Sequence, residues 1–192
     1  MTNETKTLVL GLGNLVHSDD GLGVHAIRSL TLDPGFPTDV VLMDGGTQGL
    51  NLLPHISAFE RLLVIDALDV GEPPGTLVRL EGNALRNLPG KASVHQLGFA
   101  DLMVALELLG ELPQEIVLLG VQPLSTEWGI DLSLPLAEAL PRLCNAALDE
   151  LRRWEHEPKR RAVDLPHPVR RESMPPAGAD RSAAHAVQGK SC

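Results

Sequence analysis

Short apolar runs alternate with helix-like hydrophobic spacing between residues 7 and 154 of this chain. Residues 8–10, 40–43 and 62–65 are three such runs, rich in Val, Leu and Ile and of the length expected for buried strands. The segments between and after them carry apolar side chains three or four positions apart, the spacing of a helix with one buried face. The predicted helices cover residues 21–32, a segment with Leu50, Leu53 and Ile56 on one face, residues 97–109 and residues 136–154.

Two further segments complete the predicted sheet. Residues 116–121 form a continuous apolar run and therefore another buried strand. The segment 71–75, rich in Pro and Gly, is too short for a crossover helix, so residues 76–80 should return by a tight turn as an antiparallel neighbour. We therefore predict an α/β fold with three layers, α/β/α, around a mostly parallel mixed sheet of about five strands with one antiparallel strand.

Length and composition fit one such domain followed by a tail. The chain has 192 residues, of which 43% are hydrophobic, enough for one substantial core. From Pro158 onward the sequence is rich in Pro, Arg, Ala and Ser, without aromatic residues or periodicity. A segment of this composition buries too little apolar surface to offset its ordering entropy. We predict a domain over residues 1–157 and a disordered tail over residues 158–192.

Charge and targeting features limit the classes of function. The net charge is −9, and since residues 157–192 carry a local +3, the remainder carries −12. A body this acidic repels phosphate backbones, so nucleic acid is not an expected partner. The first residues lack the basic segment of a signal peptide, and no apolar run reaches membrane-spanning length. Cys144 and Cys192 have no disulfide or metal-site spacing, so we expect a cytoplasmic protein that does not contact a membrane.

The first candidate chemistry follows the first strand, in the loop that leads to the first helix. Gly11 and Gly13 match the start of a dinucleotide-binding fingerprint, but Val16 stands where that motif needs its third glycine. Asp19 and Asp20 precede the predicted helix, where carboxylates cap a helix and interact favourably with its dipole. The same two carboxylates would compete with a phosphate, so a cation is a better ligand for this loop than a nucleotide.

Three more polar residues are candidates for the same site. Asp66 and Asp44 each end a predicted strand, at the edge of the sheet where open α/β folds bind ligands, although either could instead cap the loop that follows. His95 lies in a predicted loop before the 97–109 helix, where its imidazole could reach over the strand ends. Asp20, Asp66 and His95 together would offer two oxygen ligands and one nitrogen, a set that suits borderline divalent ions such as nickel or zinc.

Five short motifs occur in a fixed order along the chain. They are Gly-Leu-Gly-Asn with Asp-Asp-Gly between residues 11 and 21, Asp44-Gly45-Gly46-Thr47, Asp66-Ala67, His95-Gln96-Leu97-Gly98 and Gly120-Val121-Gln122-Pro123. This ordered set resembles the motifs of nickel-iron hydrogenase maturation endopeptidases. The resemblance spans residues 7–154, essentially the whole predicted domain, and the set is far more specific than any one of its members.

The resemblance implies an endopeptidase that removes the C-terminal extension from a nickel-iron hydrogenase large-subunit precursor. In that family the first acidic ligand directly precedes the helix, which corresponds to Asp20, while the second corresponds to Asp66 and the imidazole to His95. These three residues are expected both to bind nickel and to serve catalysis. The nickel belongs to the precursor, so we expect no permanently bound cofactor, and a monomer whose partner is that precursor. Replacing Asp20, Asp66 or His95 by Ala is expected to abolish processing of the nickel-loaded precursor in a folded protein. Replacing Asp19 by Ala is expected to reduce processing less.

The sequence does not identify the catalytic base. Two alternative classes of protein also remain open. No Ser nucleophile elbow, Cys-His motif or His-Glu-x-x-His helix is present in the sequence. A noncatalytic nickel-binding maturation chaperone would use the same three side chains. A peptidyl-tRNA hydrolase also begins with Gly-Leu-Gly-Asn, but its Pro-Gly and Arg-His-Asn segments are missing here, and an acidic domain suits tRNA poorly.

Overall fold

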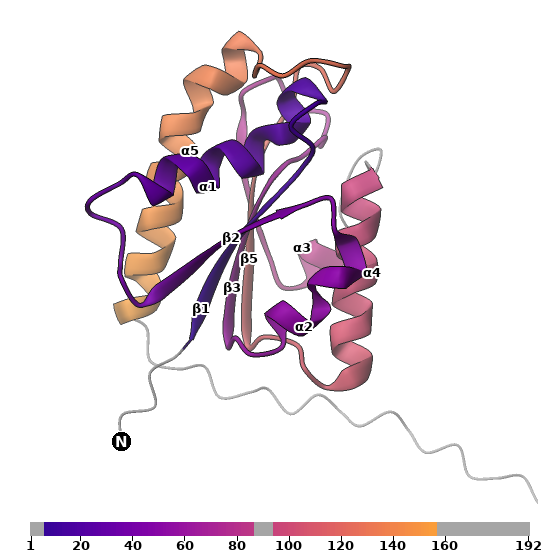
Figure 1. The fold of residues 1–192 in the computed structure, drawn as a ribbon, viewed down its shortest axis with the longest axis vertical. Coiled ribbons are helices and arrows are strands. Elements are labelled where there is room, and N and C mark those ends of the chain that lie inside the picture. Colours follow the sequence, from indigo (N-terminus) through magenta and orange to yellow (C-terminus); the bar gives the residue numbers. More distant parts are fainter. Residues whose placement is uncertain (1–5, 87–93, 157–192) are drawn as a thin grey trace, which may run out of the picture. The chain divides into compact units, whose positions relative to one another are not determined.

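Five strands form one sheet in the computed structural model, which describes residues 6–86 and 94–156 (Figure 1). The predicted tail, residues 158–192, lies outside this description. Also outside it are the side chains of residues 83, 86, 94–98 and 156. The strand order is β2-β1-β3-β5-β4, and every pair is parallel except β4 with β5. The strands are β1 (Thr7–Leu12), β2 (Val40–Gly46), β3 (Arg61–Ala67), β4 (Leu77–Glu81) and β5 (Glu115–Val121).

Helices cover both faces of this sheet, which confirms the predicted three-layer α/β/α fold (Figure 1). On one face lie α1 (Leu22–Thr31), which directly follows the short helix η1 (Ser18–Gly21), and α5 (Leu134–His156). On the other face lie η2 (Gly49–Leu52), α2 (Leu53–Ile56), α3 (Asn83–Arg86) and α4 (Val94–Leu109). No helix in the described part of the chain is long and apolar enough to cross a membrane.

Two hydrophobic cores form, one on each side of the sheet. In β1, Val9 joins the core under α1 and α5, whereas Leu8 and Leu10 join the core under α4. In β3, Leu63 likewise faces α1 and α5, and Leu62 faces α4. Every residue of these two strands is buried, because helices cover both of their faces. This double burial explains why both strands are continuous apolar runs in the sequence.

Two details of the prediction are wrong. β4 is antiparallel as predicted, but β5 lies between β4 and β3, so segment 71–75 does not close a hairpin. Leu50 is not on the buried face of its helical segment, since 53% of it is exposed. The buried pair is Leu52, at the end of η2, and Ile56, at the end of α2, and both join the core under α4.

Glycines allow α1 to lie directly against the ends of β1 and β3. A Cβ atom on Gly23 would lie 2.2 Å from the carbonyl oxygen of Leu12 and 2.3 Å from that of Ile65. Gly11 is its counterpart on β1, where a Cβ atom would lie 2.3 Å from the carbonyl oxygen of Gly23. Only glycine therefore permits this close approach, which also holds η1 near the end of β3.

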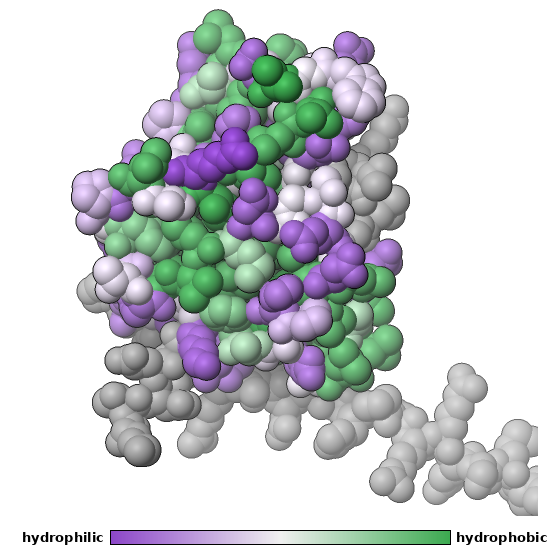
Figure 2. All heavy atoms as spheres, viewed as in Figure 1, coloured by the Kyte–Doolittle hydropathy of each residue, from purple (hydrophilic) through white to green (hydrophobic). Residues whose placement is uncertain are grey.

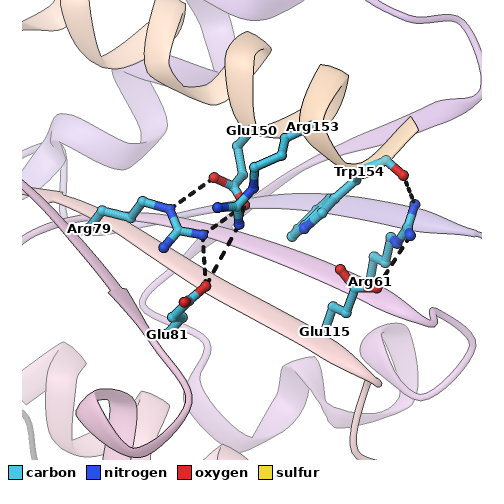
Figure 3. A network of polar contacts seen from close by, with 7 residues as sticks. All are labelled: Arg61, Arg79, Glu81, Glu115, Glu150, Arg153 and Trp154. Atoms are coloured by element: carbon cyan, nitrogen blue, oxygen red, sulfur yellow. Dashed lines mark hydrogen bonds and ion pairs between the residues drawn. The ribbon is translucent and has the colours of Figure 1, made fainter. Parts of the chain in front are cut away.

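Ion pairs and hydrogen bonds attach α5 to the sheet (Figure 3). Arg79 of β4 donates to both carboxylate oxygens of Glu150, at 2.9 and 3.0 Å. Arg61 of β3 donates to the carbonyl oxygen of Trp154 at 2.7 Å, lies 5.8 Å from the centre of its ring, and pairs with Glu115 at 3.2 Å. These contacts hold the C-terminal part of α5 against the sheet.

Candidate active site at the carboxyl ends of the strands

The strand order reverses between β1 and β3. From β1 the chain crosses to β2 on one side, then returns to β3 on the other side of β1. Open α/β sheets bind ligands at such a point, in the crevice outside the carboxyl ends of the strands. Asp66 is the penultimate residue of β3, and Asp20 lies in η1, which contacts β3. The structure thus brings together the two elements that carry the predicted acidic ligands.

Asp20 is held by the backbone of the loop that follows β1. Its side chain is buried, and its Oδ2 atom accepts a hydrogen bond from the Asn14 backbone N–H at 3.1 Å. Gly13 has a φ angle of +130°, and a Cβ atom on it would lie 1.8 Å from the Asp20 carbonyl oxygen. The loop can therefore close on η1 only with glycine at position 13. The alternative role of helix cap is not observed, because no side chain caps η1 or α1.

Asp66 is almost completely buried at the end of a central strand. It is 1% exposed, and its Oδ1 atom accepts a hydrogen bond from the Ala67 backbone N–H at 2.8 Å. On β5 its partner in the register is Gly120, where a Cβ atom would lie only 2.7 Å from the Cβ of Leu68. Burial of a carboxylate is unfavourable unless hydrogen bonds or a positive charge compensate it. The hydrogen bond from Ala67 provides part of that compensation, and a cation bound at this edge would interact favourably with the carboxylate.

Asp19 has a different role from its neighbour. It is fully buried, and its two carboxylate oxygens accept four hydrogen bonds from the loop between β5 and α5. The donors are the backbone N–H groups of Leu124, Ser125 and Ser133 and the hydroxyl of Ser133. Its oxygens are thus engaged in fastening that loop, which supports the assignment of the first ligand to Asp20.

Gln122 organises the loop that follows Asp66. Its buried side chain accepts hydrogen bonds from the backbone N–H groups of Val70 at 2.8 Å and Glu72 at 3.2 Å, and it donates to Asp69 at 3.0 Å. The sequence singled out Gln122 only as part of a motif. A polar residue directly after an apolar strand was the available signal for this role, but the loop that it fastens lies about fifty positions earlier in the chain.

His95 and Asp44 are the remaining predicted residues. The backbone of His95 lies in the first turn of α4 rather than in a loop, and its side chain is outside the described part. Among the side chains that are described, no three His, Cys, Asp or Glu residues are grouped to hold a metal ion. Convergence of Asp20, Asp66 and His95 therefore stays a prediction. Asp44 is exposed and accepts a hydrogen bond from the Gly46 backbone N–H at 3.1 Å, as in a turn.

The loop between β5 and α5 folds back over the segment that carries Asp20. The backbone N–H of Ser18 donates to the carbonyl oxygen of Gly129 at 2.8 Å, and that of Gly129 donates to the carbonyl oxygen of Val16 at 3.1 Å. The sequence of this loop has no periodicity that would predict its position. Its one distinctive signal is Trp128, in a chain with only two Trp, three Phe and no Tyr.

Comparisons of the sequence with known proteins identify its family. A family model of hydrogenase maturation proteases matches residues 24–150. The hydrogenase expression/formation protein HoxM of Cupriavidus necator is 38% identical over 180 residues, which cover 92% of this chain and 89% of that protein. The hydrogenase 2 maturation protease of Escherichia coli is 37% identical over 137 residues, covering 70% of this chain and 83% of that protein.

Solved structures show the same fold. The hydrogenase maturating endopeptidase HybD from Escherichia coli has a TM-score of 0.74 and 34% identity, covering 78% of this chain and 94% of that one. A [NiFe] hydrogenase maturation protease, HybD from Thermococcus kodakarensis, has a TM-score of 0.63 and 26% identity, covering 76% and 99%. Enzymes, rather than noncatalytic escort proteins or tRNA hydrolases, are therefore the relatives. Because the family match and these alignments span most of the chain, the protein belongs to the hydrogenase maturation protease family and is an endopeptidase of hydrogenase processing.

Proposed function

We propose that this protein removes the C-terminal extension from the large-subunit precursor of a nickel-iron hydrogenase, after nickel has been inserted into that precursor. Asp20, Asp66 and His95 recognise the nickel. The observation that carries the proposal is the burial of Asp20 and Asp66 at the carboxyl ends of the strands, on elements in contact with each other. Similarity to the Thermococcus kodakarensis protein HybD, a [NiFe] hydrogenase maturation protease, supports the choice of metal.

The proposed ligand set suits a metal that arrives with the substrate. Two carboxylates and one imidazole leave coordination positions open, so that the precursor keeps its own ligands on the nickel during docking. The positive charge of the metal would interact favourably with the buried carboxylates of Asp20 and Asp66, so that a loaded precursor would bind more favourably than an empty one. Specificity then comes from coordination of the metal rather than from a pocket for one side chain.

Cleavage needs an activated water molecule near the bound nickel. A divalent cation lowers the pKa of a bound water and polarises a nearby carbonyl group. Asp20 or Asp66 would accept the proton of that water, and the peptide bond just beyond the metal-binding motif of the precursor would be hydrolysed. Without nickel the precursor lacks both the docking contact and the activating charge, so occupancy of its metal site becomes the condition for processing.

We further propose that the protein acts as a cytoplasmic monomer with no cofactor of its own and with the precursor as its partner. Cys144, the free cysteine of the described part, is compatible with a reducing compartment. Burial, together with the nearby charge of Asp33, raises the pKa of the Cys144 thiol, which keeps it protonated and poorly reactive.

The test compares two forms of one precursor. Purified protease is incubated with nickel-loaded and with nickel-free large-subunit precursor, and the intact mass of each precursor is measured over time. We expect loss of a C-terminal peptide from the loaded form alone, and recovery of processing when nickel is restored to the empty form. Equal cleavage of both forms would contradict nickel recognition, and cleavage of neither form would contradict the assigned substrate.

A further inference from the structure

Five large apolar side chains are exposed on two segments that are hydrogen bonded to each other beside η1. We call them the Trp128 surface; they are Val16, Leu124, Trp128, Ile130 and Leu134. Their exposed fractions run from 44% for Val16 to 81% for Trp128. Figure 2 shows hydrophobic side chains, in green, exposed among hydrophilic ones at the end of the molecule where this loop lies in Figure 1. Clustered exposed apolar groups on a protein surface mark sites of interaction.

The fold holds this surface in a fixed arrangement. The rings of His17 and Trp128 have centres 4.6 Å apart, and the Nδ1 atom of His17 is hydrogen bonded to the carbonyl oxygen of Thr126 at 3.1 Å. The hydroxyl of Ser18 donates to the carbonyl oxygen of Asp131 at 3.0 Å. The carboxylate of Asp19 fastens both ends of the loop. A surface ordered before binding loses little conformational entropy when a partner docks.

The charge beside these apolar side chains is negative. Glu127 and Asp131 are exposed within the loop. Residues 7–27 and 115–141, which include both segments of the surface, contain no Lys or Arg. A segment with apolar side chains and at least one Lys or Arg would match this combination, whereas an acidic segment would be repelled.

The loop that carries most of the surface is attached next to the proposed nickel site. Asp19, which fastens the loop, is adjacent in sequence to Asp20. An extended peptide advances about 3.3 Å per residue, so a few residues of the precursor suffice to connect the two places. A chain lying on the Trp128 surface would therefore present its neighbouring residues to Asp20.

We propose that the Trp128 surface binds an extended segment of the hydrogenase precursor that flanks the scissile bond and carries apolar side chains beside a Lys or Arg. This inference rests on the proposed function. Nickel coordination alone fixes one point of the precursor, and a second contact is needed to align the peptide bond relative to that point. The Trp128 surface supplies this second contact, with Trp128 and Ile130 as its apolar anchors and Glu127 and Asp131 as its charged ones.

The first experiment observes docking directly. The full chain is labelled with 5-fluorotryptophan, which gives two fluorine NMR signals, one from exposed Trp128 and one from Trp154, which is 3% exposed. Nickel-loaded precursor is added to saturation, and complex formation is confirmed by size-exclusion chromatography. We expect the Trp128 signal to shift and the Trp154 signal to stay. A complex in which the Trp128 signal is unchanged would overturn the inference and leave the proposed function standing.

The second experiment separates docking from chemistry. Trp128→Ala and Ile130→Ala are compared with Leu108→Ala, a control that removes a similarly exposed apolar side chain from α4. We expect Trp128→Ala to raise KM for the loaded precursor about tenfold, Ile130→Ala to raise it less, and neither to change kcat more than about twofold. Melting temperatures should match the wild type in all three variants. An unchanged KM in both Trp128→Ala and Ile130→Ala would overturn the inference.

A separate double variant tests the role of negative charge on the Trp128 surface. Glu127→Gln combined with Asp131→Asn should weaken binding of the precursor at low salt and make it less sensitive to ionic strength than in the wild type. Identical salt dependence would contradict the basic character assigned to the bound segment. Failure of the unmodified protease to bind or cut the loaded precursor would instead contradict the proposed function itself, so the two failures are distinguishable.

Discussion

Asp19 and Ser133 are joined by two hydrogen bonds across 114 positions of sequence. The Ser133 backbone N–H donates to Oδ1 at 2.7 Å, and its hydroxyl donates to Oδ2 at 2.8 Å. The backbone N–H groups of Leu124 and Ser125 donate to the same Oδ2 atom, at 2.8 and 3.1 Å. One buried carboxylate thus connects the segment that follows β1 to both ends of the loop before α5. Because Asp20 is the next residue, the position of this proposed nickel ligand depends on that connection.

Replacing Asp19 by Ala should therefore destabilise the protein, an effect separate from the milder loss of processing expected from the sequence. The change leaves four donors of the loop without their acceptor, and we expect the free energy of unfolding to fall by roughly 3 kcal/mol. Urea unfolding followed by circular dichroism measures this. Asp39→Ala, which removes an exposed carboxylate, is the matched control and should change stability by less than about 0.5 kcal/mol. Equal stability of the two variants would contradict the role given to Asp19.

Replacing Asp20 or Asp66 by Asn should abolish processing while the protein stays folded. Asn keeps the shape of the side chain and one oxygen acceptor, but it lacks the negative charge proposed to bind nickel. We expect the rate of cleavage of nickel-loaded precursor to fall on the order of 100-fold or more in each variant, a larger loss than typically follows from changing only an outer-shell partner. Intact mass measures the cleavage, and Asp39→Asn should cleave like the wild type. A variant that retains full activity would remove that residue from the proposed site.

Replacing Gly23 by Ala should separate α1 from the strand ends. The added methyl group would lie within 2.3 Å of two backbone oxygens, those of Leu12 and Ile65, which cannot move aside as a flexible side chain can. We expect a loss of about 3 kcal/mol in the free energy of unfolding, measured by urea titration. Ser29→Ala, on the exposed side of the same helix, tests for a general effect of changing α1 and should be nearly neutral. Wild-type stability in Gly23→Ala would show that this close approach is not needed.

The stability of the protein should fall in mildly acidic solution because of His25. Its Nε2 atom is buried and has no hydrogen-bond partner within the described residues. Burial, and to a smaller extent the charge of Arg28, lower the pKa of His25 below its usual 6.5, against a partial opposite effect of Asp131. The unfolded chain therefore binds a proton more readily than the folded one, so this contribution to stability is complete above pH 6.5 and decreases as the pH falls below that value.

Melting temperatures of the wild type and of His25→Gln, measured at about pH 7.5 and 5.5, test this effect. We expect the decrease between the two pH values to be smaller in the variant, because Gln does not titrate. Carboxylates elsewhere affect both proteins alike, so the difference between them isolates His25. The same decrease in both proteins would show that His25 takes up its proton equally well in the folded state.

The layers of the fold could be predicted because double burial makes the strands distinctive. β1 and β3 are covered on both faces, and their runs of Leu, Val and Ile leave few alternatives. The neighbour of β4 could not be predicted in the same way. Its residues alternate between exposed and half-buried, and only the long-range pairing with β5 decides its place in the sheet.

The predicted site is partly explained by local sequence and partly by distant contacts. Asp66 was identifiable because a carboxylate directly follows the apolar run of residues 62–65, and the structure places it near the end of β3, at the reversal of the strand order. The local sequence could not show whether Asp19 or Asp20 is the proposed metal ligand, since both occur in the same short helix. It depends on hydrogen bonds between Asp19 and residues more than a hundred positions away, which no local pattern predicts.

The connection from Asp19 to Ser133 also has a consequence for synthesis of the protein. Asp19 leaves the ribosome early, but its hydrogen-bond donors are made 105 to 114 residues later. At about 5 to 20 residues per second, the segment bearing Asp20 waits roughly 5 to 20 seconds for them. A nascent or truncated chain therefore lacks the loop that holds this segment of the proposed active site, and we expect proteolytic activity only after translation has passed the loop before α5.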